Sequence, residues 1–411
     1  MIPKLIESLD ANDPLAEKRK EFLLPKDTVY LDGNSLGPLT KHAKQRVEQV
    51  IEQQWGEDLI ASWNKHDWIN LPTAVGEKIA PLIGARQGQV ICCDSTSVNL
   101  FKLLASALTL NSGRKIILSE QDNFPTDIYM AQGLAQLLGE QRCHLKRVSS
   151  QQLEPALDET VAVLMLTQVD FRSGALHDMQ RLTALAQQKG VLVIWDLAHS
   201  VGAFPVYLDE MKVDFAVGCG YKYLNGGPGA PAWVYVAKRH QAHISQPLQG
   251  WMGHRQPFAF DPDYQARQGV DRYLAGTPSI LSMVALDAAL DVFAELDLCE
   301  LQQKSHALSE LFIKYVTESP ELDGFTLLSP PDPTQRGSQL AYTHADAYAV
   351  SRALIARKVI VDFRAPSVIR FGFAPLYTRF ADVWRAVQIL SGIIGEKAYL
   401  DPQFQLRETI T

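Results

Sequence analysis

The chain has 411 residues, of which 46% are hydrophobic and 21% charged, with a formal net charge of -7. The length is enough for two or three lobes, and the acidic balance gives no reason to expect nucleic acid or an anionic membrane as a partner. The five cysteines lack a C-x-x-C pair and the ten histidines lack ligand spacing, so we expect no disulfide framework and no metal. The acidic N-terminus and the lack of a long apolar run predict a cytoplasmic protein.

The first part of the chain is predicted to be irregular. A charged N-terminal helix is expected to begin near Asp13-Pro14 and to end before Phe22. Residues 30–40 predict a short strand followed by a turn-rich loop, with Thr40 capping the next helix. The aromatic and polar stretch 55–71 has no clear period, which favours a surface loop.

From residue 72 to residue 236, apolar strands alternate with helices. The expected strands are 90–92, 115–118, 161–166, 191–195, 213–217 and 232–236, and the expected helices are 72–83, 98–110, 126–138 and 179–189. This pattern predicts an α/β fold with a mainly parallel central sheet and helices on both faces. Ligands of such sheets bind beyond the carboxyl ends of the strands.

The pattern changes after Thr277. One or two long helices are expected over 279–316, followed by strands at 325–328, 340–342, 359–363 and 368–371 and by helices at 345–357 and 380–394. We therefore predict three units: an N-terminal segment of residues 1–55 packed on the small domain, a large domain of residues 56–277, and a smaller C-terminal α/β domain of residues 278–411.

Polar clusters follow several of these strands. Asp94-Ser95-Thr96-Ser97 precedes a helix and suits either an anion site or plain N-capping. Asn123-Phe124-Pro125-Thr126-Asp127 suits either stacking on an aromatic cofactor or a Pro-initiated helix. Trp195-Asp196-Leu197-Ala198-His199 places an aspartate at a strand end, where it can pair with a pyridinium nitrogen or act as a cap.

The stretch from Gly218 to Gly229 has Lys222 at its centre, between two tyrosines and several glycines. A lysine there suits a Schiff base with a carbonyl cofactor, or a glycine-rich turn with its amine in solvent. The order of an anion site, a stacking segment, a strand-end Asp and a strand-end Lys favours pyridoxal phosphate (PLP). The sequence has no Walker A motif and no G-x-G-x-x-G after a first strand, so nucleotide binding has little support.

Seven stretches between residues 30 and 377 carry a family resemblance: Y-L-D-G-N-S-L-G-P, N-F-P-T-D, V-D-F-R-S-G, D-L-A-H-S-V-G, G-Y-K-Y-L-N-G-G-P-G, G-W-M-G-H and I-R-F-G-F-A-P-L-Y. They resemble the fold-type-I PLP enzymes of the class V aminotransferase group, and within that group the kynureninase family. The resemblance implies a homodimer with shared active sites and a small amino-acid substrate.

The resemblance also implies roles for the matching residues. Lys222 would hold PLP, Tyr221 would contact the phosphate and assist proton transfer, and Asp196 would pair with the ring nitrogen. The remaining implied cofactor contacts are Thr96 and Ser97 at the phosphate, Phe124, Pro125, Thr126, Asp127, Thr167 and His199 around the ring, and Trp251 and Thr277 from the neighbouring subunit. The implied substrate contacts are Arg370 on the carboxylate, and Trp63, Trp68 and His254 at the aromatic end.

The implied reaction is hydrolysis of the Cβ–Cγ bond of L-kynurenine to anthranilate and L-alanine, in tryptophan catabolism, with 3-hydroxy-L-kynurenine left open as a second substrate. Another class V enzyme, such as an aminotransferase, is the alternative because the cofactor frame is shared. A cysteine desulfurase needs a nucleophilic cysteine late in the chain, and none follows Cys299. A regulatory protein that binds PLP without turnover is disfavoured because Lys222, Asp196 and Arg370 are all present.

Overall fold

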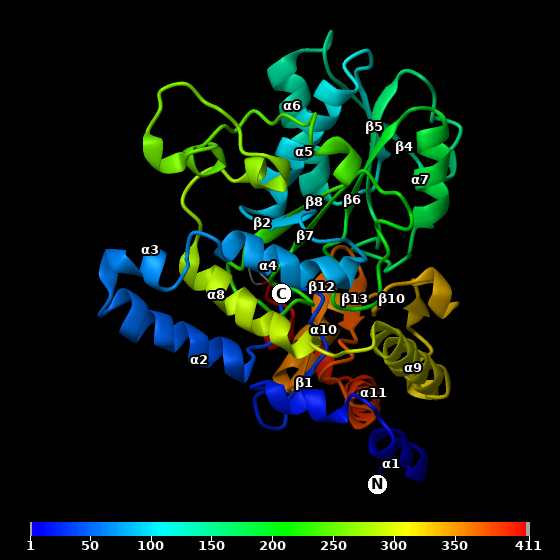
Figure 1. The fold of residues 1–411 in the computed structure, drawn as a ribbon. Coiled ribbons are helices and arrows are strands. Elements are labelled where there is room, and N and C mark those ends of the chain that lie inside the picture. Colours follow the sequence, from blue (N-terminus) through cyan, green and yellow to red (C-terminus); the bar gives the residue numbers. More distant parts are fainter. Residues whose placement is uncertain (1, 408–411) are drawn as a thin grey trace.

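The computed structural model describes residues 2–407, which form two lobes stacked one on the other (Figure 1). The larger lobe is built on a seven-stranded sheet of order β2-β8-β7-β6-β5-β3-β4. Its strands are β2 (Val90–Cys92), β3 (Ile116–Glu120), β4 (His144–Val148), β5 (Val161–Thr167), β6 (Leu192–Asp196), β7 (Phe215–Cys219) and β8 (Ala232–Val236). The strands from β7 to β4 are parallel and β8 runs against both its neighbours, so the predicted mainly parallel sheet is confirmed.

Helices cover both faces of this sheet, because its strands are apolar on both sides. Along β6, Ile194 and Trp195 are both fully buried, but they belong to different hydrophobic cores on opposite faces. One core includes residues of α4 (Leu71–Ile79), α7 (Met179–Gln188) and α8 (Ile280–Ala289). The other includes residues of α5 (Thr96–Leu110) and α6 (Pro125–Leu138).

The smaller lobe contains a four-stranded antiparallel sheet of order β12-β13-β10-β9. Its strands are β9 (Thr326–Leu327), β10 (Gln339–Thr343), β12 (Asp362–Arg364) and β13 (Val368–Gly372), and it is accompanied by α9 (Leu298–Thr317), α10 (Ala347–Ala356) and α11 (Phe380–Gly395). The predicted strand 359–363 is divided, since β11 (Val359–Ile360) pairs in parallel with β1 (Val29–Tyr30) instead of joining this sheet.

The N-terminal segment lies on the smaller lobe. Beyond the β1–β11 pair, α1 (Lys4–Ala11) packs against α11 and buries Ile6. The helix expected between Asp13 and Phe22 is present as a short 3-10 helix (Ala16–Glu21), but it begins later than predicted. Asp13 forms a turn instead, accepting from the Leu15 N–H at 2.9 Å, and is paired with Lys304 at 2.6 Å. The domain boundaries at residues 55 and 277 stay a prediction.

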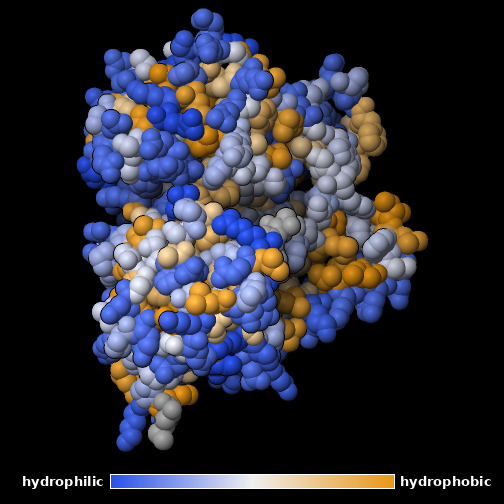
Figure 2. All heavy atoms as spheres, turned by 180° about the vertical axis from the view of Figure 1, so that it is seen from behind, coloured by the Kyte–Doolittle hydropathy of each residue, from blue (hydrophilic) through white to orange (hydrophobic). Residues whose placement is uncertain are grey.

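A projecting arm joins the segment to the larger lobe. It consists of α2 (Lys41–Gln49), a π-helical turn (Val50–Trp55) and α3 (Ser62–Lys65), and Thr40 caps α2 as predicted, accepting from the Ala43 N–H at 3.1 Å. Figure 2 shows apolar side chains gathered on this arm, where Ile60 is 81% exposed. The predicted surface loop at 55–71 is wrong in part, because Trp68 is buried and donates its indole N–H to Gln54 at 2.8 Å.

No helix between residues 2 and 407 combines the length and the apolar character needed to cross a membrane.

Candidate active site

The carboxyl ends of three neighbouring strands bring the predicted site residues together. Thr167 ends β5 and is in register with Asp196, which ends β6. Asp196 is in turn in register with Val217 of β7, and the Lys222 turn follows directly after that strand. Parallel strands therefore place Thr167, Asp196 and Lys222 at one edge of the sheet, as the sequence predicts.

Two buried carboxyl groups face each other at this edge. Asp196 accepts from the Ala198 N–H at 2.7 Å, and Asp127 Oδ2 lies 3.4 Å from the Thr167 hydroxyl, which also contacts the Asn123 side-chain oxygen. Burial raises the pKa of both, and the neighbouring charge of Asp196 raises that of Asp127 further, well above the ordinary range. Burial at this edge therefore favours protonation of the pair, with the larger rise at Asp127.

Lys222 points toward the same edge. Its Nζ lies 2.9 Å from His199 Nε2, 6.0 Å from the centre of the Phe124 ring and 5.7 Å from the centre of the Tyr221 ring. Phe124 directly precedes α6, with Pro125, Thr126 and Asp127 in the first turn of that helix. The segment therefore does form a Pro-initiated helix, and this helix is compatible with the predicted stacking of Phe124 on a cofactor ring.

The anion site predicted before α5 lies at a helix N-terminus. Thr96 and Ser97 are the first two residues of α5, and Ser95 caps the helix by accepting from the Val98 N–H at 3.4 Å. Because β2 runs parallel to β7, this helix end lies on the same edge as Asp196 and Lys222. Capping accounts for one free N–H and leaves others to favour an anion.

Arg370 is buried in the middle of β13 and is already well supplied with acceptors. Its Nε donates to Asp362 Oδ1 at 2.7 Å and its Nη2 to Asp362 Oδ2, which makes a bidentate ion pair with both side chains 2% exposed. Nη2 also reaches Ser35 Oγ at 3.2 Å, and Nη1 donates to the Phe171 carbonyl. Within the described part of the chain, the second Nη1–H meets no acceptor and remains for a further one.

Several residues at the site were not predicted from the sequence. Asp362, Ser35 and Phe171 contact Arg370, and Gln339 of β10 contacts His199 at 3.0 Å. The sequence held a signal for Ser35, because this residue lies in Y-L-D-G-N-S-L-G-P, one of the stretches that carry the family resemblance. In the structure, a Cβ on Gly37 of that loop would lie 2.3 Å from the Lys222 carbonyl oxygen. The loop must therefore pack directly on the lysine turn.

Other predicted residues lie apart from Lys222 within one chain. The stretches that carry Trp251 and Thr277 pack side by side, since the Met252 N–H donates to the Ala275 carbonyl at 3.1 Å. In residues 2–407 neither Trp251 nor Thr277 is hydrogen-bonded to Lys222 or Asp196. Trp251 is 38% exposed and Thr277 is exposed, which leaves both free to contact another molecule.

The residues predicted for the aromatic end of the substrate have local packing roles in this chain. Trp63 and Trp68 form an edge-to-face pair with ring centres 5.9 Å apart. His254 is 7% exposed, accepts from the Gln256 N–H at 3.0 Å and packs on Tyr264. Their contact with substrate stays a prediction.

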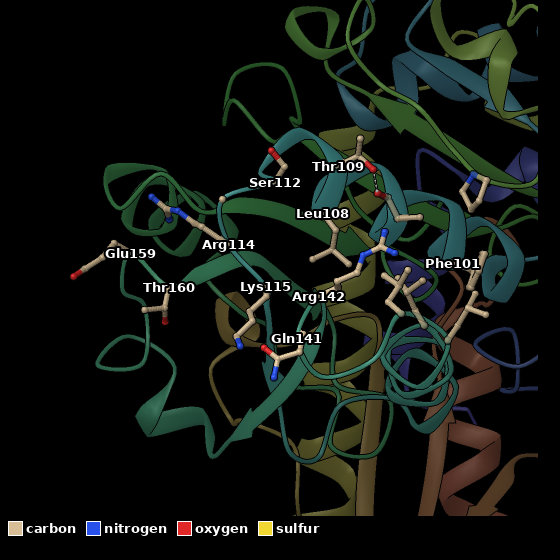
Figure 3. Close-up of a pocket in the computed structure, with 16 residues that line it drawn as sticks. Phe101, Leu108, Thr109, Ser112, Arg114, Lys115, Gln141, Arg142, Glu159 and Thr160 are labelled. Carbon is tan, nitrogen blue, oxygen red and sulfur yellow. Dashed lines mark hydrogen bonds between the residues drawn. The ribbon is translucent and has the colours of Figure 1, made fainter.

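A cavity of about 740 Å³ lies away from this edge (Figure 3). Lys115, Arg142 and Thr160 line it, and each lies just before a strand, at the amino ends of β3, β4 and β5. The cavity therefore lies at the amino ends of the strands, whereas Asp196 lies at their carboxyl ends. Among residues 2–407 there is no group of three His, Cys, Asp or Glu side chains suited to a metal.

Comparisons with known proteins identify the family. The kynureninase of Pseudomonas fluorescens is 47% identical over 409 residues, which covers 98% of both chains, and that of Burkholderia pseudomallei strain 1106a matches equally well. The chain belongs to the kynureninase family. Residues 301–390 also match the family model "Kynureninase C-terminal domain".

Solved structures of lower identity share the fold. The apo cysteine desulfurase of Thermococcus onnurineus NA1 superposes with a TM-score of 0.77 at 17% identity, covering 92% of this chain and 98% of that one. A mutant of C-DES with glycine covalently linked to its PLP cofactor gives 0.78 at 16% identity, covering 91% and 98%. The fold predicted from the sequence, that of the fold-type-I PLP enzymes, is confirmed.

Proposed function

We propose that this chain is a PLP-dependent kynureninase, which hydrolyses the Cβ–Cγ bond of L-kynurenine to anthranilate and L-alanine. The observation that supports this most is the placement of Lys222 beside Asp196 at the carboxyl edge of the sheet, in a chain 47% identical over 98% of its length to named kynureninases. The small-molecule substrate and the covalent cofactor belong to the same proposal.

The residues at this edge fit PLP. The ring nitrogen needs a carboxylate partner, which Asp196 would provide, and the ring substituents need polar neighbours. Asp127 Oδ1 is enclosed and meets no N–H or O–H donor among residues 2–407, so it has bonding capacity to spare. Phe124, about one-third exposed, offers a face for stacking, and the α5 N-terminus suits the phosphate.

When bound, PLP supplies a carbonyl that links covalently to an amine and a ring that withdraws electrons from the bond to be broken. Lys222 Nζ would remove the proton from the substrate Cα and return it during the reaction. Asp196 would hold a proton at the ring nitrogen. Burial, before all other causes, raises the pKa of Tyr221, so its phenol stays protonated and can donate to a developing carbanion.

Arg370 would orient the substrate through its carboxylate. A carboxylate oxygen can accept from the free Nη1–H of Arg370, or it can replace the Phe171 carbonyl as the acceptor of the other Nη1–H. The bond to Asp362 would stay, because removing one partner of a buried ion pair is costly. The substrate would then displace a neutral carbonyl and leave the ion pair intact.

We also propose a homodimer. Trp55 and Ile60 on the arm are 57% and 81% exposed, and Phe258 and Phe260 near Trp251 are 60% and 78% exposed. Exposed apolar groups of this size are typical of interfaces. In such a dimer Trp251 and Thr277 would contact the partner's site, as the family resemblance implies, and light scattering on the full chain measures the mass. Cytoplasmic location stays a prediction from the sequence.

One assay tests the reaction. The PLP-loaded chain is mixed with L-kynurenine, and anthranilate fluorescence and alanine are measured together. Equal amounts of the two products are expected. Removal of the substrate amine without any anthranilate would favour the aminotransferase alternative and refute the kynureninase proposal.

A further inference from the structure

Gln339 belongs to the smaller lobe, but its side chain reaches the lysine site of the larger one. It pairs with Gly372 across β10 and β13, and Ala341 pairs with Arg370. Residues opposite each other and residues two apart share a face of a sheet, so Gln339 and Arg370 lie on the same face as diagonal neighbours. Gln339 is 1% exposed, and its amide contacts the loop at 170–171 and the ring of His199.

The amide of Gln339 can have only one orientation. Its Nε2 donates to the carbonyl oxygens of Phe171 at 3.2 Å and Asp170 at 3.4 Å, while its Oε1 lies 3.0 Å from His199 Nδ1. A reversed amide would set its oxygen against two carbonyl oxygens, which have no hydrogen to share. Since Oε1 can only accept, His199 Nδ1 must carry the hydrogen.

This hydrogen decides what His199 presents to Lys222. Burial, followed by the charges of Lys222 and Arg370, holds the pKa of His199 well below its ordinary value, so the ring is neutral and has one N–H. With that N–H on Nδ1, the lone pair of Nε2 faces Lys222 Nζ at 2.9 Å. The other charged or titratable groups that act on this pair are Asp196, Asp127, Cys219, Arg370 and Arg364.

We propose that Gln339 is a positioning residue that fixes the Nδ1–H tautomer of His199 and thereby keeps an acceptor nitrogen aimed at Lys222. The hydrogen on Nδ1 follows from the geometry alone, whereas its consequence for proton transfer rests on the proposed function of Lys222. Gln339 also holds the carbonyl of Phe171, which accepts from Arg370. The tautomer therefore depends on the contact between the two lobes.

The first experiment reads the tautomer in the full-length chain without cofactor. Histidine is labelled with ¹⁵N, the His199 signals are assigned with His199→Asn, and long-range ¹H–¹⁵N spectra identify the protonated nitrogen. The wild type is expected to show Nδ1–H, and Gln339→Met to show loss of that preference. Gln241→Met is the matched control, because Gln241 is similarly buried and donates to the carbonyls of Gly88 at 2.8 Å and Val236 at 3.2 Å, far from His199.

The second experiment compares Gln339→Met with Gln339→Glu in the PLP-loaded chain by following the cofactor's visible absorbance against pH. Glu keeps the acceptor and adds a negative charge, which stabilises a cation at Lys222 Nζ. The pH at the midpoint of the absorbance change is therefore expected to rise. Met removes the acceptor, so the midpoint is expected to fall. A merely structural role would move both variants in the same direction.

An Nε2–H tautomer in the wild type, or an unchanged tautomer in Gln339→Met, would overturn the proposal. Midpoints that shift together, or that match Gln241→Met, would do the same. These results are distinct from failure of the proposed function, which would appear as a wild type that gains no visible absorbance with PLP. In that case the tautomer measured without cofactor still decides the proposal.

Discussion

Asp32, two residues after β1, is the clearest case of a group whose titration should be visible in stability. Its enclosed Oδ1 meets no hydrogen-bond donor among residues 2–407. Burial, followed by the charge of Asp362, raises the pKa of Asp32 from 3.8 to about 7, although Ser35, Arg370 and Arg364 oppose the rise. The folded chain therefore holds this proton over a pH range in which the unfolded chain has lost it.

The sign and the size follow from linkage. Below about pH 4 Asp32 is protonated in both states and contributes nothing to pH dependence. As the pH rises from about 4 to about 7, the unfolded state is favoured, and above that range the full penalty is present. A difference of about three pKa units corresponds to up to about 4 kcal/mol, at about 1.4 kcal/mol for each unit.

The test is Asp32→Asn, which keeps the shape and removes the titration. Urea unfolding at pH 4 and at pH 8 gives the free energy of unfolding of each variant. We expect Asn to raise that free energy relative to the wild type at pH 8, by up to about 4 kcal/mol more than at pH 4. Asp122→Asn, at an exposed loop position, is the control for losing one carboxylate. An equal difference between wild type and Asp32→Asn at both pH values would refute the reasoning.

Three further predictions concern turnover. Lys222→Ala should abolish anthranilate production and the covalent cofactor absorbance while leaving the circular dichroism spectrum unchanged; wild-type rates would contradict its assigned role. Because Asp196 ends β6 next to the Lys222 turn and would pair with the ring nitrogen, Asp196→Asn should lower kcat by roughly 100-fold or more and Asp127→Asn far less, and equal losses would contradict that assignment. Arg370→Lys should lower kcat/KM for L-kynurenine by roughly 10–100-fold, equivalent to about 1.5–3 kcal/mol for a charged hydrogen bond, and an unchanged KM and kcat would argue against carboxylate binding.

The strands of the larger lobe could be predicted because local pattern determines them. Strands β2 and β8 have the predicted limits, and β5, β6 and β7 differ from theirs by one or two residues. Strand β4 was not predicted. It reads H-L-K-R-V and is the outermost strand of the sheet, where side chains stay partly exposed and no apolar run forms. The divided strand at 359–363 was missed for another reason, since only the distant β1 decides that its first half pairs elsewhere.

The site shows the same division. The sequence alone determined that Asp196 and Lys222 follow neighbouring apolar strands, because the alternation of strands and helices puts such residues at one edge of a parallel sheet. Only the tertiary structure decided what they meet there. Burial and the charge of Asp196 beside it raise the pKa of Asp127, and Gln339 and Asp362 come from a separate lobe more than one hundred residues away in the chain. Contacts between lobes leave no periodic signal in the sequence, since they depend on how two separately patterned units pack.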